Sequence, residues 1–447
     1  MSWSAYRTYK CSGVEWLGDV PSHWGVDRIK WSVRSSQNGV WGQEADGGVD
    51  DIRCVRVADF DRPKRRIQDD DVTYRRVTAQ ERRGRLLTKG DLILEKSGGG
   101  EKSPVGFVVL YDRTDPAVTS NFLARVSLRP GMEPRFWTYL HSCLYKSRLT
   151  QPSIKQTSGI QNLDQHSYFN ERACFPPFDE QQLIADWLDI ETAKIDTLIA
   201  KQEQLIATLR EDRTATITHA VTKGLDPDVE MQASGLPWVG DIPRHWQLVP
   251  IKHVVRSIGV GLVINPSTYV ADSGVPFLLG RNVRDGWIDL TNVNYMSEVD
   301  SRRLEASRLK AGDVVVVRAG YPGRAAVISA DLDGANCASI LILRKPTLAR
   351  PELVAAFFNS LLGRAQVKLA QYGAAQEQIN VGDVVNFVMP LPPPSEQQEI
   401  AERISAKAAV IDALVEKANE MIDALREYRS ALITDAVTGK IDVREAA

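Results

Sequence analysis

The feature that most constrains this 447-residue chain is an internal duplication. The segment EWLGDVPSHW (15–24) returns as PWVGDIPRHW (237–246), so Trp, Gly, Asp, Pro, His and Trp all recur 222 positions later. This offset continues through KGDLILEKSG (89–98) and AGDVVVVRAG (311–320), and it becomes 216 from Arg129 and Lys345 onward. A repeat of this kind predicts two copies of one scaffold.

The two copies are alike at their edges and different in their middles. PPFDEQQLIA (176–185) pairs with PPPSEQQEIA (392–401), whereas the middles, 36–86 and 258–308, share almost nothing. The scaffold therefore carries two different inserts. We predict five parts: a conserved N-terminal segment (1–27), a first insert domain (28–175), a central conserved region (176–249), a second insert domain (250–390) and a C-terminal conserved helix (391–447).

Both copies of the EQQ segment predict a long helix. Asp179 with Gln182, and Ser395 with Gln398, fit a capping box that follows a run of prolines. No proline or glycine interrupts the segment before Gly224 in the first copy or Gly439 in the second. A helix over 179–223 would be about 67 Å long.

Each predicted helix has one apolar seam in a charged surface, and such a seam needs a partner. We expect the two helices to pair with each other; the alternative is that each seam packs on its own globular domain. The predicted seam residues follow a heptad spacing and match between copies: Ile184, Leu188, Ile195, Leu198, Leu205 and Leu209, and Ile400, Ile404, Ile411, Leu414, Met421 and Leu425.

The inserts have mixed α/β patterns and a basic charge balance. A Gly-Asp turn leads into a buried strand in each copy, and the segments 133–149 and 351–370 predict amphipathic helices. Residues 28–170 hold 24 Lys and Arg against 17 Asp and Glu, and residues 250–390 hold 15 against 12. The predicted helices are acidic. This distribution favours inserts that contact phosphate, although a basic cluster can also be a solvated face.

Catalytic motifs are not apparent in the sequence. SGGGEKS (97–103) has Glu101 where a phosphate loop needs glycine. FPPF (175–178) begins with Phe175, which cannot bond a target amino group as the similar methyltransferase motif requires. His23 and His245 are expected to be structural. The five scattered cysteines argue against a zinc site, and without an apolar span or leader we expect a cytoplasmic protein.

The repeated opening segment, the PPxxEQQxIA helix starts and RTATITHAVTKGLD (213–226) with its copy RSALITDAVTGKID (429–442) resemble the specificity subunit of type I restriction-modification systems. The resemblance implies an α+β fold in which two mixed α/β target recognition domains are joined by two long antiparallel coiled-coil helices with pseudo-twofold symmetry. It implies a non-catalytic subunit that recognises an asymmetric bipartite site in double-stranded DNA as part of bacterial defence. No cofactor is expected in this chain.

The same resemblance implies partners and DNA-binding segments. Two modification subunits carrying S-adenosylmethionine and restriction subunits using ATP and Mg²⁺ would bind this scaffold, and no membrane would be involved. Bases would be approached by the Gly-rich loops at 96–102 and 318–324 and by the amide-rich stretches at 156–162 and 376–380. With the basic clusters, the candidate DNA-binding residues are Arg62, Lys64, Arg65, Arg66, Arg75, Arg76, Lys96, Lys102, Gln156, Gln161, Asn162, Arg281, Arg284, Arg318, Arg324, Gln376 and Gln378.

The alternative function is a coiled-coil adaptor that binds no DNA. It would explain the helices and the missing catalytic motifs. It would not explain basic, divergent inserts on a repeated scaffold.

Overall fold

The computed structural model describes residues 3–157, 159–263, 265–372 and 377–445. The chain divides into two compact units, one made of 1–201 with 421–447 and the other of 202–420. Two long helices, α4 (Phe178–Lys223) and α10 (Pro394–Val437), each have one end in each unit. Within the described residues, no helix is long and apolar enough to cross a membrane.

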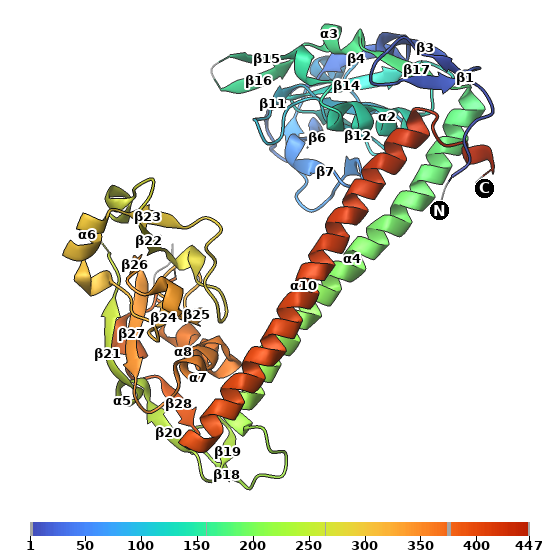
Figure 1. Ribbon diagram of the computed structural model, residues 1–447. Helices are drawn as coiled ribbons and strands as arrows, with labels where there is room; N and C mark the ends of the chain where they lie inside the picture. Colours follow the sequence, from blue (N-terminus) through green and yellow to red (C-terminus); the bar gives the residue numbers. More distant parts are fainter. Residues whose placement is uncertain (1–2, 158, 264, 373–376, 446–447) are drawn as a thin grey trace. The chain divides into compact units, whose positions relative to one another are not determined.

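The first unit is built on an antiparallel sheet packed against helix α2 (Pro134–Lys146) (Figure 1). The strand order is β12-β10-β14-β4, and the predicted Gly-Asp turn leads into β10. Asp91 in that turn is buried and accepts hydrogen bonds from Arg125 Nε at 2.7 Å and Ser127 Oγ at 2.6 Å. The strands are β4 (Val33–Asn38), β10 (Leu92–Glu95), β12 (Val108–Leu110) and β14 (Leu123–Leu128).

Smaller elements complete the first insert. A mixed sheet in the order β13-β6-β9-β5 has one parallel pair, β13 with β6, and a short hairpin joins β7 to β8. These elements are β5 (Gln43–Glu44), β6 (Asp51–Val55), β7 (Phe60–Asp61), β8 (Arg66–Ile67), β9 (Tyr74–Arg76), β13 (Ala117–Thr119), α1 (Ala79–Arg82) and α3 (Gln165–Phe169).

The second unit has a similar sheet, in the order β21-β27-β24-β25. Asp313 in its Gly-Asp turn is also buried, and it accepts from Arg344 Nη1 at 2.7 Å. The elements are α5 (Ile251–Val254), β21 (Val255–Val260), β22 (Val275–Leu278), β23 (Asn294–Met296), α6 (Glu298–Arg303), β24 (Val314–Val317), β25 (Ala325–Val327), β26 (Asn336–Cys337), β27 (Ile340–Pro346) and α9 (Val381–Val384).

The helix predicted over 351–370 is two helices, α7 (Pro351–Asn359) and α8 (Leu361–Ala370). Ser360 divides them because its hydroxyl donates to Phe357 O at 2.6 Å and accepts from Gly363 N at 3.1 Å, which caps α8. Gly363 lies so close to α7 that an added Cβ would be 2.1 Å from Phe357 O. The apolar pattern spans both helices, so periodicity alone does not reveal the break.

Four short strand pairs connect the long helices to the inserts, and they occupy equivalent positions in both copies. In the first unit they are β1 (Tyr9–Cys11) with β2 (Asp19–Pro21), and β3 (Gly25–Arg28) with β17 (Arg172–Phe175). In the second they are β18 (Met231–Ala233) with β19 (Asp241–Pro243), and β20 (Gln247–Pro250) with β28 (Val388–Leu391).

The repeated His-Trp pair holds the first turn of each long helix. Trp24 Nε1 donates to Glu180 at 2.8 Å, and His23 Nε2 is 2.7 Å from the same carboxylate. In the second copy, Trp246 Nε1 and His245 Nε2 lie 3.1 and 2.5 Å from Glu396. The opening segment is therefore repeated because each long helix needs the same attachment at its start, which confirms the structural role expected for the two histidines.

The predicted capping boxes are wrong. The helices begin one residue earlier, at Phe178 and Pro394, so Asp179 and Ser395 lie inside the first turn. The first glutamine of each EQQ motif instead forms hydrogen bonds with backbone groups of neighbouring loops. Gln181 donates to Pro176 O at 2.9 Å and accepts from Glu133 N at 3.0 Å, and Gln397 does the same with Pro392 O and Arg350 N.

In each unit the two long helices lie side by side (Figure 1), and ion pairs between them run in antiparallel register. Asp196 pairs with Arg429 in the first unit; in the second unit, Arg213 pairs with Asp412 and Asp212 with Lys407. The helix ends are also part of the globular cores. Ile184 and Leu188 at the start of α4 belong to the core of the first unit, and Ile400 at the start of α10 belongs to the core of the second, so each seam also packs on its own domain at the start of its helix.

The heptad seam is wrong at four positions. Leu198, Leu205, Leu414 and Met421 are 45–51% exposed. The buried positions instead recur every eleven residues in both helices: Ile184, Ile195, Ile206 and Ile217, and Ile400, Ile411, Ile422 and Ile433, all at most 7% exposed. Eleven residues make three turns of 3.67 residues, close to the 3.6 of a straight helix, so these isoleucines keep one face without a left-handed supercoil.

Candidate nucleic-acid interface

The fold brings together the two segments of the first insert that were expected to approach DNA. The Gly-rich loop forms β11 (Ser97–Gly98), which pairs with β16 (Ile160–Leu163), and β16 pairs with β15 (Ile154–Thr157). Ser97 lies opposite Asn162 and donates to its side-chain oxygen at 2.6 Å. A three-stranded sheet therefore places the loop and the amide-rich stretch on one surface.

The amides of this sheet differ in orientation. Gln156 and Asn162 are exposed, as is Lys102 in the adjoining loop. Gln161 is only 7% exposed and accepts from Val105 N at 3.3 Å, so it holds the Gly-rich loop and is not available to a base. Lys96 is half-buried, and burial lowers the pKa of its ammonium group.

The second insert brings the corresponding segments together in a simpler way. Isolated backbone bridges join Gln378 to Ala319 and to Tyr372, and Ile379 N donates to Arg318 O at 3.1 Å. The Arg318 side chain extends to the Tyr372 hydroxyl at 3.4 Å. Gln376 lies outside the described residues.

A cleft of about 460 Å³ adjoins β11 in the first insert. Its lining includes Gly98 and Gly99 of the loop, Asn121, and the aromatic side chains of Trp41 and Phe122, which are 39% and 44% exposed. Neither aromatic residue was predicted as a site residue. Arg75 stacks over Trp41 with 4.5 Å between its guanidinium carbon and the ring centre, and the sequence shows neither this contact nor the exposure of the two rings.

Several of the candidate basic residues of the first insert form ion pairs with acidic residues of the same chain. Arg62 pairs with Glu95 at 2.7 Å; burial raises the pKa of that carboxyl, and Arg62 acts against the rise. Arg76 pairs with Asp46 at 2.5 Å, and Lys64 and Arg66 pair more loosely, both at 3.4 Å, with Asp61 and Asp112. Ion-paired arginines can exchange partners at a surface, so these remain candidates.

Arg65 was predicted to contact DNA, but its side chain is buried. It is 5% exposed, its backbone φ is +56°, and its guanidinium lies 4.4 Å from the ring centre of Tyr139. Burial lowers the pKa of this guanidinium. The side chain packs toward α2 and cannot contact DNA in this conformation. A run of basic residues does not reveal which member turns inward, because that depends on the hairpin conformation.

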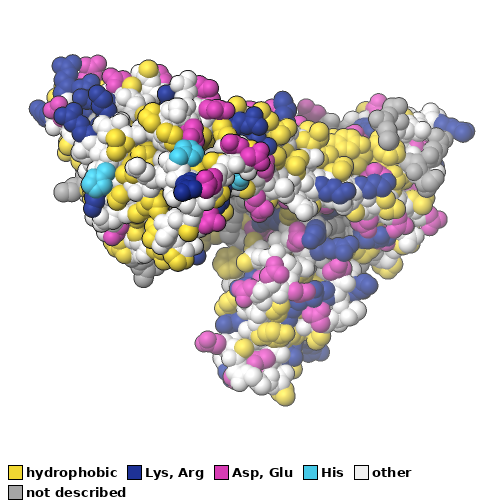
Figure 2. Space-filling model, turned by 90° about the horizontal axis from the view of Figure 1, so that it is seen from below, with side chains coloured by type: hydrophobic (Ala, Val, Ile, Leu, Met, Phe, Trp, Pro, Cys, Tyr) yellow, Lys and Arg dark blue, Asp and Glu magenta, His cyan; other side chains and the backbone are white. Residues whose placement is uncertain are grey.

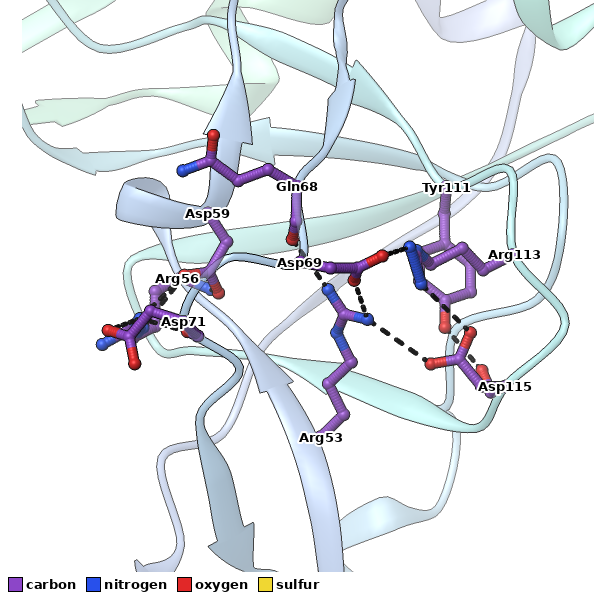
Figure 3. A network of polar contacts seen from close by, with 9 residues as sticks. All are labelled: Arg53, Arg56, Asp59, Gln68, Asp69, Asp71, Tyr111, Arg113 and Asp115. Atoms are coloured by element: carbon purple, nitrogen blue, oxygen red, sulfur yellow. Dashed lines mark hydrogen bonds and ion pairs between the residues drawn. The ribbon is translucent and has the colours of Figure 1, made fainter.

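The acidic run at 69–71 forms ion pairs with arginines outside the predicted basic clusters. Asp69 pairs with Arg53 at 2.8 Å and also with Arg113, while Asp71 pairs with Arg56 at 3.2 Å (Figure 3). Arg53 is buried at 6% exposure, so this network supports the mixed sheet. Figure 2 likewise shows basic side chains interspersed with acidic ones on the face it presents.

The candidate arginines of the second insert are also partnered. Arg281 donates to the side chain of Asn294 at 3.0 Å, and Arg324 stacks over Tyr321 at 4.3 Å. Arg284 binds Asp289 at 2.8 Å and lowers the pKa of that carboxyl to about 2. Across the described part of the chain, no group of three or more His, Cys, Asp and Glu could hold a metal ion.

Comparisons with known proteins agree with the resemblance stated above. The chain is 24% identical over 337 residues to the Type I restriction enzyme EcoBI specificity subunit of Escherichia coli, a match that covers 73% of this chain and 70% of the relative. It is 22% identical over 452 residues to the putative type I restriction enzyme MjaX specificity subunit of Methanocaldococcus jannaschii, with 96% of both chains covered. No family model matches the chain.

A solved structure shares the fold. It was determined in a study of complex assembly and conformational transition of the type I restriction-modification system. The match has a TM-score of 0.66 at 16% identity and covers 94% of this chain and 99% of that one. The relatives confirm the predicted resemblance to type I specificity subunits.

Proposed function

We propose that this chain is the DNA-recognition subunit of a type I restriction-modification complex, and that each insert recognises one half of a bipartite site. One observation carries this proposal: equivalent strand pairs and helix starts support two inserts whose surfaces differ. The differing surfaces are the sheet around Asn162 in the first insert and the bridges around Gln378 in the second. An asymmetric bipartite site requires two such unlike readers on one scaffold.

The described contacts support specific roles within each reader. Gln156 and Asn162 are exposed amides, which suit adenine, and Arg281, Arg318 and Arg324 suit guanine or phosphate. Lys102 is exposed beside the same sheet. Arg62, Lys64, Arg66, Arg75 and Arg76 would contribute salt-dependent attraction to the phosphate backbone.

The proposal extends to the domains and partners. Residues 28–175 and 250–390 would be the recognition domains, and the paired helices would fix the distance between them. Two methyltransferase subunits would bind the duplicated scaffold, bringing S-adenosylmethionine, and restriction subunits would bring ATP and Mg²⁺. The chain itself would recognise DNA without catalysing a reaction.

An exchange of one insert tests the proposal. Residues 28–175 are replaced by the corresponding segment of a relative, the chain is co-expressed with its methyltransferase partner, and methylated bases are mapped across the host genome. One half-site should change and the other should stay. The matched control replaces 250–390 and should change the other half-site.

Two results would count against the proposal. If either exchange altered both half-sites, the inserts would not be independent readers. If the unaltered complex methylated no bipartite sequence and the purified chain bound duplex DNA no more tightly at low salt than at high salt, the adaptor without DNA binding would be favoured.

A further inference from the structure

One arginine in each unit joins three parts of the protein. In the first unit, Arg429 on α10 pairs with Asp196 on α4, with Nε 2.9 Å from a carboxylate oxygen. Its Nη2 also donates to Pro63 O at 2.7 Å, in the turn between β7 and β8. Arg429 is 7% exposed. This arginine therefore links α10, on which it lies, to α4 and to the tip of an insert hairpin.

The second unit contains the same arrangement with the helices exchanged. Arg213 on α4 lies 3.6 Å from the Asp412 carboxylate on α10, and its Nη2 donates to Asp285 O at 2.6 Å. Asp285 also lies at a hairpin tip, since a bridge joins Val283 to Ile288 on either side of it. Only 13% of the Arg213 side chain is exposed.

The members of the two arrangements occupy equivalent positions in the duplication. Arg213 and Arg429 are 216 residues apart, as are Asp196 and Asp412, and Pro63 and Asp285 are 222 apart. These are the offsets of the surrounding scaffold. The two hairpin tips nevertheless lie in the middles of the inserts, where the sequences share almost nothing. We name these contacts the arginine bridges: Arg429–Asp196–Pro63 and Arg213–Asp412–Asp285.

The acceptor on each insert is a main-chain carbonyl, which every residue type supplies. A scaffold arginine can therefore hold an insert whatever its side chains are, provided that a hairpin tip reaches the same place. Neighbouring contacts strengthen each attachment: Arg135 on α2 binds Asp186 on α4 at 2.6 Å, and Thr218 on α4 accepts from Leu361 N at 2.8 Å. The charge-assisted, largely buried donor favours one fixed geometry.

We propose that Arg429 and Arg213 are positioning residues that fix the orientation of each insert on the helix pair, and thereby the number of base pairs allowed between the two half-sites. The inference rests on the proposed function and adds a determinant of spacing to it. The helices set the length of the scaffold, and the arginine bridges set how rigidly each reader is held to it. Neither arginine contacts the base-reading surface.

The test uses Arg429→Met and Arg213→Met, which keep a long apolar side chain and remove the donors. Each full-length variant is co-expressed with the methyltransferase partner, and genomic methylation is counted at sites whose half-sites are separated by every spacer length. Arg210→Met is the matched control, because Arg210 lies one turn before Arg213 on an exposed face of α4.

The unaltered protein and Arg210→Met should methylate a single spacer length. Each bridge variant should keep both half-site sequences, while methylation at spacers one base pair longer or shorter rises at least severalfold relative to the main spacer. Loss of stability alone would lower methylation at all spacers together. Arg429→Lys, which keeps a donor but not the two-pronged geometry, should be intermediate.

The proposal is overturned if the Met variants methylate only the original spacer, whatever their total activity. If a Met variant does not accumulate as soluble protein, Asp196→Asn and Asp412→Asn, which weaken the same bridges, are scored by the same measure, and unchanged spacing in them has the same meaning. If the unaltered protein yields no bipartite sequence, the proposed function fails and the arginine bridges are not the cause.

Discussion

The two units use equivalent internal contacts to present unlike surfaces. Glu180 and Glu396 each accept from the tryptophan of their own copy of the His-Trp pair. Gln181 and Gln397 each donate to the backbone oxygen of an equivalent proline. The outer surfaces differ: the first insert has a three-stranded sheet beside its Gly-rich loop, whereas the second has only isolated bridges at that place among its described residues.

This contrast shows which contacts tolerate divergence. At four of the contacts between scaffold and insert, the insert supplies backbone: Pro63 O and Asp285 O to the arginine bridges, and Glu133 N and Arg350 N to the glutamines. Other contacts use insert side chains, such as Arg135 on α2, which binds Asp186 on α4. Backbone groups persist through substitution, so the side chains of the inserts are free to change. At these four contacts, the duplication preserves the side chains of the scaffold partner only.

The largest expected difference in stability between the two units comes from substituting the glutamate at the start of each long helix. The Glu180 side chain is 11% exposed and also accepts from Tyr6 at 3.2 Å, whereas the Glu396 side chain is 36% exposed. Glu180→Ala should lower the free energy of unfolding of the first unit by about 3 kcal/mol, because Trp24 would keep a buried N–H without an acceptor. Glu396→Ala should cost about 1 kcal/mol. Hydrogen exchange resolved by unit measures both, and equal losses would contradict the difference.

A lower pH should also reduce the stability of the first unit more than that of the second, by less than the Glu180 substitution does. His141 is buried in the first unit, with Nδ1 2.6 Å from the Tyr168 hydroxyl, and burial lowers its pKa to about 4. The unfolded chain protonates near pH 6.5, so this contribution to stability is complete above that pH and is lost as the pH falls toward 4. At pH 5 the first unit should have lost about 2 kcal/mol.

The second unit provides the internal control for this pH effect, because its three histidines, at 219, 245 and 253, are exposed. Hydrogen exchange at pH 7 and pH 5, corrected for intrinsic rates, should show the loss in the first unit alone. In His141→Gln the difference should disappear. A loss of equal size in both units, or one that persists in this variant, would exclude His141 as its source.

The smallest expected effect tests the eleven-residue spacing of the helices in each unit. Ile206→Val in the second unit and Ile422→Val in the first should each cost about 1 kcal/mol, because a buried methyl group is removed. Leu205→Val and Met421→Val, one residue away and half-exposed, should cost about 0.5 kcal/mol or less. Chemical denaturation of the four variants compares them, and a larger cost at Leu205 than at Ile206 would restore the heptad seam.

The scaffold was predictable from sequence because each signal in it occurs twice. The bounds of α4, the Gly-Asp strands and the structural role of His23 and His245 all follow from matching the two copies. The heptad seam failed because Ile184 and Ile195 fit both spacings; the recurrence of isoleucine every eleven residues in both copies was the distinguishing signal. The orientation of Arg65 and Gln161 was not predictable, since it depends on partners such as Tyr139 and Val105, which lie far away in the sequence.

The composition of the first unit has a consequence for how the chain is made. Its core combines Trp24 and Leu188 with Leu432, Ile433 and Ile441, and Asp442 N donates to Ser4 O at 2.8 Å. A ribosome therefore releases every residue of the second unit before it supplies the last part of the first. The N-terminal insert must wait, partly assembled, while about 220 later residues are translated, which at ~10 residues per second is roughly 20 seconds. During that time, chaperones have their longest access to the surface that residues 421–447 will cover.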